Sequence, residues 1–63
     1  MFTISLKAAR VNAEMTQDEA AKYMGVARAT IHNWENGKKP IKEYQKKQFA
    51  ELYKINLENI FFK

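Results

Sequence analysis

The segment 16–40, TQDEAAKYMGVARATIHNWENGKKP, contains helix start and end signals so closely spaced that it leaves room only for two short helices and the turn between them. Thr16 opens it and Glu19 follows three residues later, the capping-box pattern that satisfies two free backbone N–H groups at the start of a helix. Gly25 supplies the left-handed residue that ends the first helix, and Gly37 ends the second. These signals therefore predict helices over 16–24 and 27–36.

The sequence before this segment also follows a helical period. Residues 5–13 begin with Ser5, a candidate N-cap, and Ile4 is placed to pack against the first turns of the helix at Ala9. The inward stripe consists of Leu6, Ala9, Arg10 and Ala13. These features predict a helix over 5–13.

The sequence after Pro40 predicts two further helices. Residues 42–53 bury apolar side chains at helical spacing, namely Phe49, Leu52 and Tyr53. Residues 56–61 predict a short last helix capped by Asn56, with Leu57 and Ile60 inward. Because there is no strand alternation, repeat or linker, we expect an all-α fold of five helices in a single domain over 1–63.

Length and composition exclude several classes of protein. At 63 residues the chain is near the lower size at which one core suffices, and its hydrophobic content of 46% can fill that core. Without cysteine there can be no disulfide framework or thiolate zinc site, and one histidine cannot replace them, so we expect no metal and no cofactor. No apolar run is long enough for a signal peptide or a membrane span, which predicts a cytoplasmic protein. The net charge of +4 suits a nucleic-acid partner but is also common in unrelated small proteins.

The helix expected over 27–36 has two unlike faces. At 100° per residue, an arc of about 100° holds Ala27, Thr30, Ile31 and Trp34. The opposite side, about 140° wide, holds Arg28, Ala29, His32, Asn33 and Asn36. Small side chains let a backbone approach DNA bases, and Arg, Asn and His match the donors and acceptors of the major groove. The second face is therefore expected to recognise bases, as the second helix of a helix-turn-helix does.

The same residues resemble the helix-turn-helix of the Cro/cI family of phage repressors, also called the XRE family. The resemblance rests on Thr16-Gln17, Ala21, Gly25-Val26, Ile31 and the run WENGK, and it extends back to Leu6 and Arg10 and forward through FAELYKINLENIF. It implies a compact five-helix lambda-repressor-like domain. The sequence departs from the family pattern at four positions: Glu14, where Gly is common; Ala20, often Leu; Ala27, usually a Ser or Thr cap; and Lys46, often apolar.

The resemblance also implies roles for individual residues. Base edges would be contacted by Arg28, Ala29, His32 and Asn33. Phosphates would be held by Gln17, Asn36, Lys38 and Lys39. For Gln17 the physics agrees, because the start of a helix carries free N–H groups and a partial positive charge. An ion pair between Arg10 and Glu35 would join the first helix to the third.

Each role has a plainer alternative. Arg28, Lys38 and Lys39 could be solvated charges, Ala29 a helix former with no other role, and His32 an idle surface residue. Trp34 could be an exposed platform for stacked bases, but its angle beside Ile31 favours the core. The lysines of the fourth helix, Lys42, Lys46 and Lys47, are expected to face solvent.

An enzyme is not expected. Asp18, Glu19 and Glu35 offer carboxylates and His32 a base, but the first turn of a helix explains Asp18 and Glu19. We also expect no pocket large enough for a substrate in a chain this short.

The sequence thus predicts sequence-specific binding of double-stranded DNA and regulation of transcription. We expect a small phage or prophage regulator that binds its operator as a homodimer in the bacterial cytoplasm or nucleoid, either complete and Cro-like or the DNA-binding part of a longer repressor. The alternative is a protein-binding helix-turn-helix, such as an antitoxin or a modulator of another repressor. The aromatic end IFFK, residues 60–63, offers a surface for such a partner.

Overall fold

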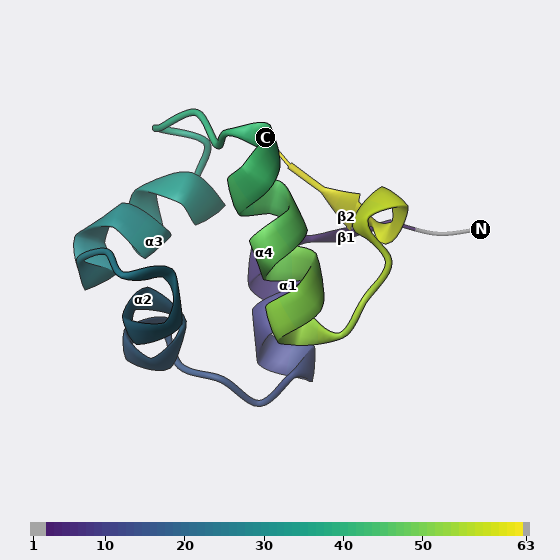
Figure 1. The fold of residues 1–63 in the computed structure, drawn as a ribbon, viewed down its shortest axis with the longest axis horizontal. Helices are drawn as coiled ribbons and strands as arrows, with labels where there is room; N and C mark the ends of the chain where they lie inside the picture. Colours follow the sequence, from purple (N-terminus) through teal and green to yellow (C-terminus); the bar gives the residue numbers. More distant parts are fainter. Residues whose placement is uncertain (1–2, 63) are drawn as a thin grey trace.

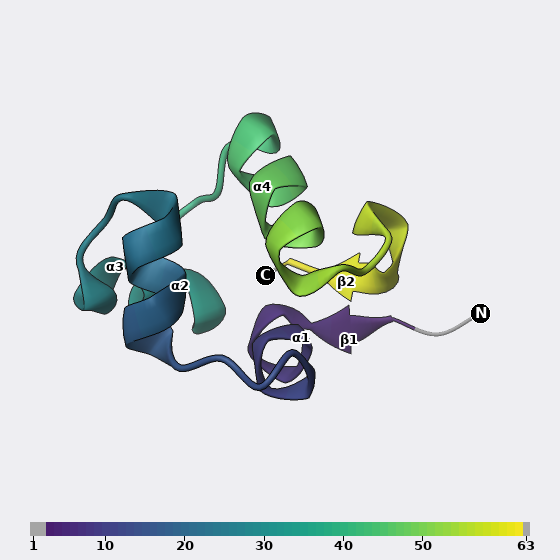
Figure 2. The ribbon, with the colours of Figure 1, turned by 60° about the horizontal axis from the view of Figure 1, so that its bottom comes forward.

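The computed structural model describes residues 3–62, and most of them lie in short helices (Figure 1). In chain order the elements are β1 (Ile4–Ser5), α1 (Leu6–Asn12), α2 (Gln17–Met24), α3 (Arg28–Glu35), α4 (Glu43–Tyr53), the 3₁₀ helix η1 (Leu57–Asn59) and β2 (Ile60–Phe61). The pair α2 and α3 lies on one side of α1 and α4, and the two short strands lie on the other (Figures 1 and 2). Over residues 3–62 no helix is long and apolar enough to cross a membrane.

The first two helices begin, and α2 also ends, where local signals predict. The Ser5 side chain accepts a hydrogen bond from the Ala8 backbone N–H at 3.0 Å, which caps α1. Thr16 and Glu19 form a complete capping box at the start of α2. At the other end of α2, Gly25 is left-handed with φ 71°, a conformation that a residue without a Cβ adopts without strain.

The third helix has a strong end and a weak start. It begins at Arg28, and its N-cap, Ala27, has no side-chain oxygen to satisfy the free N–H groups of the first turn. After it, the Lys38 N–H donates to the Asn33 carbonyl at 2.9 Å and the Gly37 N–H to the Trp34 carbonyl at 3.3 Å, the two bonds of a Schellman motif. This motif ends α3 sharply and fixes the direction of the loop that carries Lys38.

The expectations of five helices and no strands were wrong. Residues 57–59 form one 3₁₀ turn, so the described chain has four α-helices, and the Asn56 side chain does not cap the turn. Ile4 pairs with Ile60, and Ser5 with Phe61, in a parallel two-stranded sheet that ties the two ends together. Strands of two residues are too short to show an alternating pattern. The helical helix-turn-helix class of the fold nevertheless agrees with the prediction.

The core is aromatic at its centre. Phe49 and Ile31 are fully buried, and the Trp34 ring meets the Phe49 ring edge-on with centroids 5.6 Å apart. Tyr53 stacks on Phe49, with ring centroids 5.7 Å apart. The indole N–H of Trp34 donates to the Pro40 carbonyl oxygen at 3.2 Å, so both its ring and its polar atom have partners inside the protein. Trp34 therefore belongs to the core, as its angle on the helix predicted.

Two side chains are not exposed or buried as the sequence predicted. Ala27, expected on the inward arc of the third helix, is exposed because it precedes the helix rather than lying within its first turn. Lys46, expected to face solvent, is only 28% exposed: its ammonium lies 5.4 Å from the centre of the Phe62 ring and 3.5 Å from the Glu43 carboxylate. The apolar stem of a lysine can cover a hydrophobic surface while its charge stays in water, so Lys46 substitutes in part for an apolar residue.

Candidate nucleic-acid interface

The first turn of α2 and the first two turns of α3 line an open groove of about 290 Å³. It is lined by Gln17, Arg28, Ala29, His32 and Asn33. Four of these residues come from α3, and Gln17 comes from the first turn of α2. The structure thus brings together the four residues that the sequence predicted to contact bases and one that it predicted to hold a phosphate. We refer to this feature as the α2–α3 groove.

The four α3 residues differ in how exposed they are. Arg28, Ala29 and His32 are exposed, whereas Asn33 is half-buried. The Nε of Arg28 lies 3.9 Å from an Asp18 carboxylate oxygen, and the two side chains are 66% and 69% exposed. An ion pair this long and this exposed is weak, so the guanidinium remains available to another partner. The sequence explained Asp18 as a first-turn residue of a helix and did not indicate that it faces Arg28.

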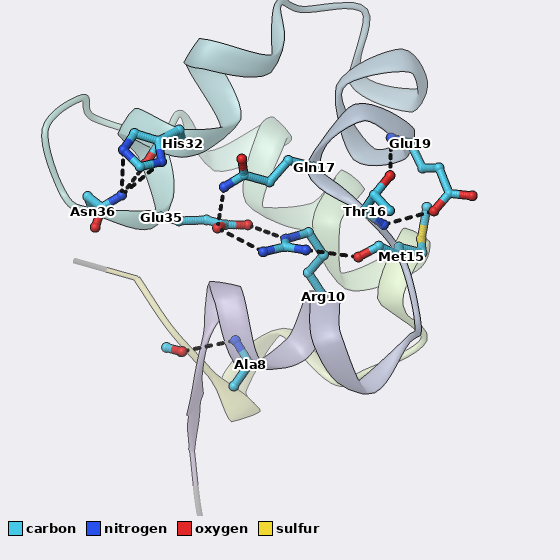
Figure 3. Close-up of polar contacts among 10 residues, drawn as sticks. Ala8, Arg10, Met15, Thr16, Gln17, Glu19, His32, Glu35 and Asn36 are labelled. Carbon is cyan, nitrogen blue, oxygen red and sulfur yellow. Dashed lines mark hydrogen bonds and ion pairs between the residues drawn. The ribbon is translucent and has the colours of Figure 1, made fainter.

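Asn36 is turned back onto α3 rather than outward. Its side-chain amide donates to the His32 carbonyl oxygen at 2.7 Å and lies 3.4 and 3.5 Å from the two nitrogens of the His32 ring (Figure 3). The amide has only two hydrogens to donate. A contact between this amide and a phosphate therefore requires the side chain to leave His32.

Lys38 and Lys39 lie in the loop that the Schellman motif directs away from α3, and both are exposed. Within residues 3–62 neither ammonium has an ion-pair partner. Their positive charge is therefore not neutralised by a neighbouring side chain.

A buried carboxylate connects the three helices around the groove (Figure 3). The Nε of Arg10, on α1, donates to one Glu35 oxygen at 2.7 Å, and its Nη2 lies 3.4 Å from the other. The Nε2 of Gln17, on α2, donates to the same second oxygen at 3.1 Å. The side chains of Arg10 and Glu35 are only 11% and 2% exposed. The resemblance suggested the pair between Arg10 and Glu35, but no sequence pattern indicated the bond from Gln17, because it depends on how α2 crosses α3.

A protein-family model described as helix-turn-helix matches residues 6–59. The chain belongs to the XRE family of helix-turn-helix domains. XRE-family domains are DNA-binding regulators of transcription rather than enzymes. Neither a curated protein nor a solved structure matches the chain. In this XRE-family domain, α2 and α3 are the two helices of the motif, and the α2–α3 groove lies between them.

Proposed function

We propose that this domain recognises a specific double-stranded DNA operator and regulates transcription, as a small Cro-like repressor of a phage or prophage or as the DNA-binding part of a longer repressor. The observation that carries the proposal is the α2–α3 groove, in which four side chains of the second motif helix meet Gln17 of the first. The second helix of a helix-turn-helix places such residues against base edges in the major groove.

The chemistry of the groove supports base contacts by α3. Arg28, in the first turn of the helix, can donate two hydrogen bonds to O6 and N7 of a guanine. Asn33 can pair with an adenine, and Ala29 offers only a methyl group, which can pack against a thymine methyl. His32 can donate or accept according to its tautomer. These side chains would determine sequence preference.

Contacts to phosphates would come from the edges of the groove. Gln17 lies at the start of α2, where the helix dipole favours an anion. Lys38 and Lys39 have no competing carboxylate among the described residues. Asn36 would join them after leaving His32. Such contacts fix the register of a protein on DNA without reading its sequence.

A domain of this size buries too little surface to bind tightly alone, so we propose that two copies bind half-sites about one helical turn apart. The operator would lie in DNA of the bacterial cytoplasm or nucleoid.

The rival proposal is a protein-binding module. It is favoured by one observation, the 57% exposure of the Phe61 ring on β2, close to the aromatic end of the chain. Lys63, the last residue of that end, lies outside the described residues.

Selection of duplexes from a random-sequence pool with the purified chain tests the two proposals against each other. We expect enrichment of one sequence and preferential binding of that sequence over a scrambled duplex. Equal affinity for selected and scrambled duplexes, or no binding to either, would overturn the proposal of an operator-specific regulator.

A further inference from the structure

Gln17 occupies two environments at once. Its side chain lines the α2–α3 groove, and its Nε2 donates to the Glu35 carboxylate at 3.1 Å behind the groove. Glu35 does not line the groove, and its side chain is 2% exposed. The carboxylate therefore cannot meet DNA itself but is bonded to a residue that can.

A carboxylate determines which end of the Gln17 amide faces inward. An ionised carboxylate can only accept hydrogen bonds, so the NH₂ end of the amide must face it and the oxygen must face away. Figure 3 shows this arrangement, with the Gln17 nitrogen directed at Glu35 and the oxygen turned from it. One of the two amide hydrogens is used by Glu35, and the other remains for a partner in the groove.

Glu35 is itself held firmly. Arg10 binds both of its oxygens, and the Nη1 of Arg10 is anchored on the Met15 carbonyl oxygen at 2.9 Å. Met15 lies next to Thr16, the N-cap of α2, so the same guanidinium also ties the start of that helix to Glu35. A rigid acceptor reduces the number of rotamers that Gln17 can adopt, which lowers the entropy lost when a ligand binds to it.

We propose that Glu35 is a positioning residue for DNA binding, which holds the Gln17 amide so that its second N–H can donate to a phosphate. The inference rests on the proposed function of the α2–α3 groove and adds to it a role for a residue that does not contact DNA. Glu35 thus both links the helices and orders the binding surface.

The test compares Glu35→Gln with Arg10→Lys. The first variant replaces the carboxylate by an amide that can present either end to Gln17, while the second keeps the carboxylate and the charge but loses the forked contact of the guanidinium. Both lower the melting temperature, so affinity is measured at a temperature at which both are folded. The probe is a mixed-sequence duplex of roughly 20 base pairs, two helical turns, because a phosphate contact does not depend on sequence.

For Glu35→Gln, the loss of a charge and the loss of positioning predict opposite changes in DNA affinity. Glu35→Gln removes a negative charge, which by itself favours binding to DNA. Loss of positioning instead weakens binding, by roughly three- to tenfold, the size expected for one hydrogen bond. Arg10→Lys keeps the carboxylate that orients the Gln17 amide but holds it less rigidly, so it should weaken binding less than Glu35→Gln does. In a Gln17→Leu background Glu35→Gln should no longer weaken binding, since the side chain that it positions is gone.

The Gln17 side-chain amide signals in proton–nitrogen correlation spectra give a second readout without DNA. They should move further in Glu35→Gln than in Arg10→Lys, because Arg10→Lys keeps the carboxylate that accepts the Gln17 hydrogen bond. If Glu35→Gln binds as tightly as the unchanged protein or more tightly, or weakens binding equally without Gln17, the positioning role is wrong while the proposed function stands. If the unchanged protein binds no duplex, the proposed function fails and the positioning role fails with it.

Discussion

The carboxylate of Asp18 lies 3.9 Å from the guanidinium Nε of Arg28, so the first turn of α2 places a negative charge beside the residue best suited to contact a guanine. The same carboxylate would stand close to the phosphates of a duplex in the α2–α3 groove. Its negative charge stabilises the start of α2 but repels the phosphates of DNA.

Asp18→Asn should therefore raise the affinity for all duplexes, by roughly two- to fivefold, the range of an exposed charge interaction. The matched control is Glu51→Gln, which removes an exposed carboxylate on α4. Titrations at low salt with one duplex measure both. If Glu51→Gln raises the affinity as much as Asp18→Asn, the effect comes from net charge and the local role of Asp18 is wrong.

A second prediction concerns the left-handed residue after α1. Glu14 has φ 59°, and this is the position at which the family commonly has Gly. A side chain with a Cβ is strained in this region, so Glu14→Gly should raise the free energy of unfolding by about 1 kcal/mol. Lys7→Gly, in the exposed face of α1, is the control and should lower it by roughly 0.5–1 kcal/mol. Urea denaturation measures both, and a destabilised Glu14→Gly protein would contradict the prediction.

A third prediction concerns the pH dependence of stability. Within residues 3–62 the buried Tyr53 hydroxyl has no hydrogen-bond partner. Burial raises the pKa of Tyr53 above its usual value and the nearby Glu35 charge adds to the rise, while Arg10 opposes it. Above pH 10, roughly the pKa of an unfolded tyrosine, the unfolded chain loses this proton and the folded chain keeps it. Tyr53 should therefore leave stability unchanged below about pH 10 and lower it as the pH rises further.

Tyr53→Phe should abolish this part of the alkaline loss and should change stability little at neutral pH, because the hydroxyl that it removes has no hydrogen-bond partner among residues 3–62. Tyr44→Phe is the control, since Tyr44 is 59% exposed. Denaturation curves recorded from neutral to alkaline pH compare the three proteins. If the unchanged protein and Tyr53→Phe lose stability in parallel, the buried hydroxyl does not cause the loss.

A fourth prediction concerns the lysines after α3. Lys38→Ala and Lys39→Ala should each weaken binding to all sequences alike and flatten the slope of log affinity against log salt by roughly one unit or less. Lys47→Ala, an exposed lysine on α4, should leave the slope unchanged. A loss of affinity for a selected operator only, with the slope intact, would show that these lysines do not hold phosphates.

Local signals explain why much of the fold could be predicted. Ser5, Thr16 and Gly25 act on backbone groups a few residues away, so their effects are visible in the sequence itself. The Trp34 ring was predicted in the core from its angle beside Ile31, because helical spacing fixes which side chains share a face.

Contacts between distant segments could not be predicted in this way. The pairing of Ile4 with Ile60 uses backbone groups that every residue has, so it leaves no mark in the sequence. The bond from Gln17 to Glu35 depends on the crossing of two helices, and the position of Lys46 depends on the approach of Phe62. The four α3 residues of the groove could be named from one helix face, but the connection of Gln17 to a buried carboxylate required the folded chain.

The last prediction tests the base contacts of α3. Arg28 is in the first turn of the helix, its side chain is 66% exposed, and its one ion pair among residues 3–62 is the weak contact with Asp18, so its guanidinium is available to pair with O6 and N7 of a guanine. Ala cannot replace that pair, and Lys can imitate it only as a point charge. Arg28→Ala should cost about 1–3 kcal/mol on the preferred operator and relax the preference at one base pair in each half-site, with non-specific affinity reduced much less. Arg28→Lys should restore much of the non-specific affinity but not that preference, because the charge alone acts on all sequences.

Selection from random duplexes with the unchanged protein and both variants measures the preference at every position. If all three proteins select the same sequence with the same stringency, Arg28 is a solvated charge, and recognition must come from Ala29, His32 and Asn33.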